Sequence, residues 1–146
     1  LMDALNLYRH RFEPSDQLDK PYAIAAMGFF AADTDEEGEY LATSMQQQFL
    51  NLRRGTPGQL PKPVKSMDDI WNRVEKAGVD HAMRYAAIGG RDTVRKKLRD
   101  FIDMTKADEI MVTANIFDQE ARLKSFSIAA ELHKDLSSDE TGQHNA

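Results

Sequence analysis

The feature that most constrains this chain is an unbroken apolar stretch that leads into a capped helix. Residues 22–30 read YAIAAMGFF, in which polar and apolar residues do not alternate. Such a run is typical of a strand buried on both faces, as in parallel sheets. Thr34 and Glu37 then have the spacing of a capping box, and the acidic residues around them suit the positive end of a helix dipole. A strand, a short turn and a helix that runs to about Leu52 make one βα unit.

The same order of elements occurs twice more. Residues 85–88 form a short apolar run that ends in Gly-Gly, and a helix with an apolar stripe through Val94 and Leu98 follows. Residues 109–114 form a third run, followed by a turn and a final helix. Consecutive units of this kind imply parallel strands joined by right-handed crossovers. The sequence therefore predicts an α/β fold whose strands, 22–30, 85–88 and 109–114, are adjacent in chain order.

Helical periodicity also occurs outside these units. It is already present at Leu1, so we expect further chain upstream. Another helix is predicted from Ser66, with Asp69 at the capping-box position. We expect residues 1–136 to form one domain and the polar residues 137–146 to be disordered. The final helix is predicted to bury a stripe made of Ala121, Leu123, Phe126, Ala130 and Leu132.

Residues 53–65 contain three prolines and two glycines, a density of helix and strand breakers that predicts a loop. A loop of this length in a compact fold is usually either functional or disordered. Two interpretations follow: a mobile lid beside a site, or a plain solvent-exposed linker.

Composition excludes several classes of function. The net charge of −5 argues against a nucleic-acid partner, which requires a basic face. No apolar run approaches the length of a membrane span, so we expect no membrane partner. The chain has no cysteine, which fits a cytoplasmic location and excludes thiolate chemistry. Its four histidines lack metal-ligand spacing, so no metal site is predicted.

Three stretches, in order and spacing, resemble the bacterial luciferase-like flavin-dependent monooxygenases. They are AADTDEEGEYLA at 31–42 after the first strand, AIGGRDTVRKKLRDF at 87–101, and ADEIMVTANIFDQEARLKSFSIAAEL at 107–132. Together with the strand before them, they extend the resemblance over nearly the whole chain.

This resemblance implies that residues 1–136 are the C-terminal three βα units of a TIM (β/α)8 barrel. It implies reduced flavin mononucleotide (FMN), supplied by a reductase, and dioxygen acting on a small organic substrate at the C-terminal ends of the strands. The family's catalytic residues belong to earlier strands, so none is assigned here, and we expect this chain by itself to be an incomplete and inactive part of the enzyme.

On the same basis, the turn before the second βα helix and the end of the last strand are candidates for flavin binding. A glycine turn at a helix N-terminus exposes N–H groups that bind anions, although such a turn can also serve only the backbone geometry. Asn115 is open to a second reading as a helix cap. The candidate residues are Gly89, Gly90, Arg91, Thr113 and Asn115.

Ala26 and Met27 are candidates for lining the substrate pocket, because small residues at a strand end leave room for a ring, while Met27 also suits a packed core. Arg53 and Arg54 open the candidate lid. Trp71 is interpreted as a core residue.

The alternative to an enzyme is a non-catalytic α/β module used for assembly. An open sheet exposes strand edges and apolar faces, which favours association. We therefore expect a homo-oligomer held through Ile24, Ala26, Ile110 and Val112.

Overall fold

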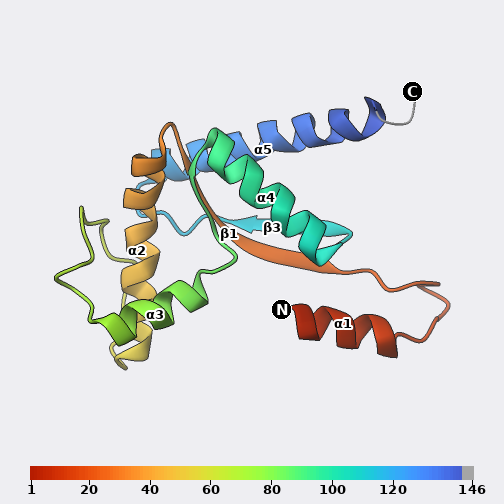
Figure 1. The fold of residues 1–146 in the computed structure, drawn as a ribbon, viewed down its shortest axis with the longest axis horizontal. Helices are drawn as coiled ribbons and strands as arrows, with labels where there is room; N and C mark the ends of the chain where they lie inside the picture. Colours follow the sequence, from red (N-terminus) through yellow and green to blue (C-terminus); the bar gives the residue numbers. More distant parts are fainter. Residues whose placement is uncertain (143–146) are drawn as a thin grey trace.

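The computed structural model describes residues 1–142 and has an α/β architecture (Figure 1). A parallel sheet lies at the centre, with α4 and α5 along it, α2 and α3 together at one end, and α1 near the other end. The elements in chain order are α1 (Met2–Arg11), β1 (Ile24–Ala32), α2 (Asp35–Arg53), α3 (Arg73–Ala82), β2 (Ala87–Gly90), α4 (Arg91–Thr105), β3 (Glu109–Thr113) and α5 (Gln119–Gly142).

The strands are parallel, as predicted, but the predicted chain order is wrong: the sheet order is β2-β1-β3. Residues 24–28 of β1 pair with residues 109–113 of β3. Residues 29–32 of β1 pair instead with residues 87–90 of β2. The sequence shows three apolar runs but does not show which runs pair, and the short β2 pairs only with the last four residues of β1.

The main core lies between one face of the sheet and helices α4 and α5. Alternate residues of β1, from Ala25 to Ala31, point to this side and are fully buried. Val94 and Leu98 of α4 pack against them, which confirms the predicted stripe of that helix. Because α4 and α5 both cover this face, the opposite face of β1 is free for other elements.

A serine of α5 completes the hydrogen bonding of β1 where β3 has ended. Ser125 Oγ accepts a hydrogen bond from the Ala31 amide at 3.0 Å and donates one to the Phe29 carbonyl at 3.2 Å. Ser125 is 0% exposed, so both backbone groups would have no other partner there. One side chain thus substitutes for a missing stretch of strand.

Helix α2 covers the other face of β1 at the strand's C-terminal end. Phe30 and Ala32 pack against Leu41 and Ala42 of α2. The helix begins as predicted, because the Thr34 side chain accepts a hydrogen bond from the Glu37 amide. It therefore sits across the end of the strand and not along the outside of the sheet with α4 and α5.

Helix α3 starts later than predicted. Its N-cap is Asn72, which forms a reciprocal capping box with Glu75. Ser66, the predicted start, instead accepts a hydrogen bond from the Asp68 amide in a local turn. Two capping-like patterns compete in this stretch, and the one followed by an uninterrupted helix prevails. Trp71 is half-buried and packs in a small cluster between α2 and α3, consistent with its interpretation as a core residue.

The predicted stripe of the last helix is only partly correct. Leu132 is buried as predicted, but Leu123 is 56% exposed and Phe126 and Ala130 are exposed too, while Ser125 and Ile128 are buried in their place. The hydrogen bonds of Ser125 to β1 fix which side of α5 meets the sheet. The helix also continues to Gly142, beyond the boundary predicted at 136, and residues 143–146 of the predicted tail lie outside the described residues.

Candidate functional site

The open face of the sheet is the first part of the candidate site. Three pairs across β1 and β3 share this face: Ile24 with Glu109, Ala26 with Met111, and Gly28 with Thr113. Ile24 and Met111 are each 54% exposed. This open face carries the apolar residues Ile24, Ala26 and Met111, with Glu109 and Thr113 as its polar members.

The predicted site residues of the strands divide between the two faces. Ala26 and Thr113 lie on the open face, and the Thr113 hydroxyl lies 3.4 Å from the Met27 carbonyl, to which it donates a hydrogen bond. The Met27 side chain points the other way and is 3% exposed in the main core, so the predicted pocket-lining position does not agree with its burial. Ile110 and Val112 are partly buried against that core, so they do not share the open face with Ile24 and Ala26, and the expected association through all four residues stays a prediction. The strand alternation makes Met111 the exposed residue in their place.

A wall closes this face at the C-terminal end of the strands. A Cβ atom at Gly28 would lie 3.2 Å from the Phe30 ring, which places that ring beside the open face. Asn115, which follows β3, has its Nδ2 atom 3.7 Å from the Met45 sulfur of α2. The open face therefore ends at α2 and the residues after β3, where side chains from separate parts of the sequence meet.

The turn before α4 is built around a carboxylate of α2. Gly89 has φ +136°, a conformation that side chains rarely adopt, which explains the glycine. The Gly90 amide donates to Asp35 Oδ1 at 2.7 Å, and the Thr93 hydroxyl donates to Asp35 Oδ2 at 3.0 Å. These bonds, the backbone one foremost, lower the pKa of Asp35. The Gly90 amide, which the sequence suggested as a donor to a bound anion, therefore already donates to the carboxylate of Asp35.

Arg91 is directed toward α5. Its guanidinium forms ion pairs with Glu131 and, at 3.0 Å, with Asp135. The hydrogen bonds that Arg91 donates to these carboxylates, the one to Glu131 foremost, raise the pKa of Arg91. Its charge therefore fastens α4 to α5, and the structure does not bring it together with Ala26 and Thr113.

Arg54 fastens the start of the candidate lid to α3. Its Nε and Nη2 atoms donate to the two carboxylate oxygens of Glu75 at 2.8 and 2.9 Å, and Nη2 also donates to the Ile70 carbonyl at 2.8 Å. The Arg54 guanidinium is the main cause that lowers the pKa of Glu75 to about 2. Arg53 is exposed, and its guanidinium lies where a side chain at Gly78 would be.

The candidate lid, residues 53–65, is mostly exposed but is attached to α2 at several points. Gln47 Nε2 donates to the Lys62 carbonyl at 2.9 Å, and Thr43 Oγ1 accepts from the Val64 amide at 2.9 Å. The Lys62 ammonium also lies 5.9 Å from the centre of the Phe117 ring, just after β3. Sequence reasoning missed these contacts, because a glutamine on a helix carries no signal for a distant carbonyl.

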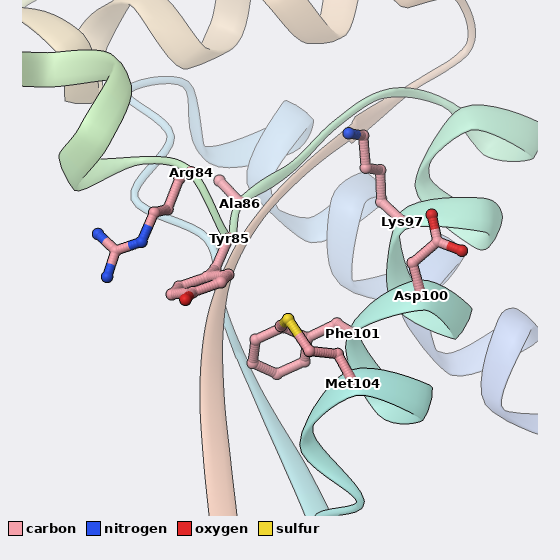
Figure 2. A pocket seen from close by; sticks show the side chains of 7 residues that line it. All are labelled: Arg84, Tyr85, Ala86, Lys97, Asp100, Phe101 and Met104. Carbon is pink, nitrogen blue, oxygen red and sulfur yellow. The ribbon is translucent and has the colours of Figure 1, made fainter. Parts of the chain in front are cut away.

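A separate small cavity of about 200 Å³ lies between α4 and the residues before β2. Figure 2 shows Tyr85, Phe101 and Met104 at its apolar side, with Arg84 and Lys97 at its edges. Arg84 stacks on the Tyr85 ring, 4.4 Å from its centre. Phe101 and Met104 belong to the last turns of α4, so this cavity lies away from the C-terminal ends of the strands.

Within residues 1–142, no group of three or more histidines, cysteines or carboxylates is placed to hold a metal ion. In the same part of the chain, no helix is long and apolar enough to cross a membrane.

Comparison with known proteins gives the family. A protein of Escherichia coli (strain K12) named luciferase-like monooxygenase is 46% identical over 136 residues, covering 93% of this chain and 41% of that protein. The uncharacterised protein YvbT of Bacillus subtilis (strain 168) is 49% identical over 131 residues, covering 90% of this chain and 39% of that protein. No family model matches the chain.

The crystal structure of apo-MsnO8 superimposes with a TM-score of 0.72 at 25% identity, over 91% of this chain and 41% of that one. The chain thus spans about two fifths of the length of the proteins it matches. It belongs to the luciferase-like monooxygenase family, as the three sequence stretches predicted.

Proposed function

We propose that this chain is part of a flavin-dependent monooxygenase barrel and that its open strand face borders the flavin site. The observation that carries the proposal is the pairing of β1 with β3, with α4 and α5 packed behind them. Consecutive strands of a (β/α)8 barrel are neighbours, each followed by an outer helix. In this proposal β1 and β3 are consecutive barrel strands, and α4 is the helix between them.

Residues 33–90 are then an excursion inserted between β1 and α4. The support for this is the order β2-β1-β3, which a barrel of three successive units would not have. The excursion carries α2, which packs over the C-terminal end of β1, where barrel enzymes place their active sites. The candidate lid belongs to the same excursion.

The residues of this chain fit the planar ring of FMN better than they fit its phosphate. Ala26, Met111 and Thr113 are exposed on one face of the strand pair, where the small Ala26 and Gly28 leave room for a planar ring. The α4 N-terminus does not offer its Gly90 amide to the phosphate, because Asp35 already accepts from it. The phosphate is therefore held by other groups, and Gly89 and Gly90 have the role of shaping the turn.

Bound reduced FMN supplies the electrons with which dioxygen is activated toward an organic substrate. The contribution of this chain is to hold the ring against the strand face and to keep water away at the strand ends. Phe30, whose ring lies beside the open face, and Phe117, exposed just after β3, supply apolar surface at that end. We further propose that the flavin arrives from a separate reductase and that the chain alone is inactive.

A chimaera tests the proposal. The matched 136 residues of the E. coli relative are replaced by this chain, and FMN binding is followed by quenching of flavin fluorescence. We expect saturable binding by the chimaera and none by this chain alone. A folded chimaera that binds no flavin, beside a parent protein that does, would contradict the proposal.

A second candidate function, assembly without catalysis, is favoured by the exposure of Ile24 and Met111 on the open face and of Tyr22 just before β1. Burying an apolar side chain of this size contributes about 1.5–3 kcal/mol. If assembly is the function, the isolated chain should associate with further copies of itself through this face. Light scattering measures this association. A monomer of 16.5 kDa with the face exposed to water would exclude the assembly function.

A further inference from the structure

A groove of about 480 Å³ lies between α2 and the segment that leads into α3. None of the residues that line the groove lies on the open strand face, so the two are separate. One side comes from α2 and the other from residues 65–80. Its lining residues used below are Glu36, Glu39, Tyr40, Lys65, Trp71 and Lys76. This volume is in the range of small-molecule sites.

Two aromatic side chains border the groove. Tyr40 is 41% exposed on α2, and Trp71 is half-buried on the opposite side. The Lys76 ammonium lies 5.4 Å from the centre of the Trp71 ring, while Asp80 accepts a hydrogen bond from it at 2.7 Å. The molecule thus already places an ammonium group against this ring, with a carboxylate beside it.

The charges around the groove favour a cation. Four carboxylates line it, against two lysine ammonium groups. Asp80 neutralises Lys76, but Glu36 and Glu39 form no ion pair within the described part of the chain. Both belong to the first two turns of α2, beside Tyr40. Two carboxylates without a cation therefore stand next to an exposed aromatic ring.

We propose that this groove binds a small organic ammonium compound that carries an apolar or aromatic group. The ammonium lies between Glu36, Glu39 and the aromatic rings, which attract cations through their faces. The apolar part lies beside Met67 and Ile88, which are the apolar aliphatic members of the groove lining. This site goes beyond the flavin-dependent activity, because it needs neither the strand face nor a flavin.

Binding can be measured on the chain itself through Trp71, its only tryptophan. Benzylammonium, benzyl alcohol and benzoate form a matched set of probes of equal shape with positive, zero and negative charge. We expect a saturable change in tryptophan fluorescence with benzylammonium, and an affinity at least about tenfold lower for the other two, a difference of about 1.4 kcal/mol. Equal affinity for the alcohol, preference for benzoate, or no saturable change would each overturn the proposal.

A pair of double variants separates the site from general charge effects. Glu36→Gln with Glu39→Gln should weaken benzylammonium binding about tenfold. Glu13→Gln with Asp16→Asn removes the same charge from the exposed linker after α1 and should leave binding unchanged. Equal weakening by both double variants would mean that the groove does not recognise the cation.

Discussion

The substitution Ser125→Ala should destabilise the fold strongly for the loss of a single hydroxyl group. It removes the partner of the Ala31 amide at 3.0 Å and of the Phe29 carbonyl at 3.2 Å, and Ser125 is 0% exposed. A buried polar group left without a partner costs about 1–3 kcal/mol. Two such groups, less the hydroxyl that no longer has to be buried, give an expected loss of about 2–3 kcal/mol.

Ser127→Ala is the matched control. Ser127 lies two residues along the same helix, is exposed, and donates only to the Leu123 carbonyl within the helix. Ser127→Ala gains the same helix propensity as Ser125→Ala, about 0.5 kcal/mol, but it leaves no buried group without a hydrogen-bond partner. Urea unfolding followed by far-ultraviolet circular dichroism gives both free energies of unfolding. If the two variants differ by less than about 0.5 kcal/mol, the role assigned to Ser125 in completing β1 is refuted.

Three further outcomes are expected. Gly38→Ala should lower the free energy of unfolding by at least about 1 kcal/mol, because its Cβ would lie 2.6 Å from the backbone of the β2–α4 turn, whereas Gly58→Ala, with open space, should not; urea unfolding checks both. Lys106→Gly should raise the melting temperature, since Lys106 has φ 48° at the end of α4, and Lys106→Ala, which keeps the strain, should not. The pKa of Glu75 is lowered from 4.5 to about 2 by Arg54, so its ionised form stabilises the fold above pH 4.5 and this contribution is lost as the pH falls toward 2. The melting temperatures of the wild type and Arg54→Gln should therefore differ at pH 6 and converge near pH 2; a constant difference would contradict the assignment.

The sequence predicted the local elements well because each has a local cause. The apolar run 22–30, the Thr34 cap and the stripe through Val94 and Leu98 all depend on neighbours within a few residues. The family resemblance was also confirmed. Strand order was not predicted correctly, because the runs at 85–88 and 109–114 look alike to a rule that considers only hydrophobicity and length.

The hydrogen-bond partners of the candidate site residues could not be predicted, because those partners lie far along the chain. Nothing local to Gly90 indicates that Asp35 accepts from its amide, 55 residues away. Likewise, the phase of α5 depends on Ser125 meeting β1, 94 residues from its partner Ala31. Strand alternation is local, and it puts Ala26 on the open face and Met27 in the core, while the role of Ala26 at a substrate pocket stays a prediction.

The most direct test of the central claim is flavin binding by the chimaera when the open strand face is blocked. Ala26→Trp fills the surface between β1 and Met111, whereas Ala130→Trp adds the same bulk at an exposed position of α5. Titration with FMN is expected to give saturable binding for the unmodified chimaera and for Ala130→Trp, and at least about a hundredfold weaker binding for Ala26→Trp, a loss of about 2.8 kcal/mol. Unchanged FMN affinity in a folded Ala26→Trp chimaera would contradict the assignment of this strand face to the flavin site.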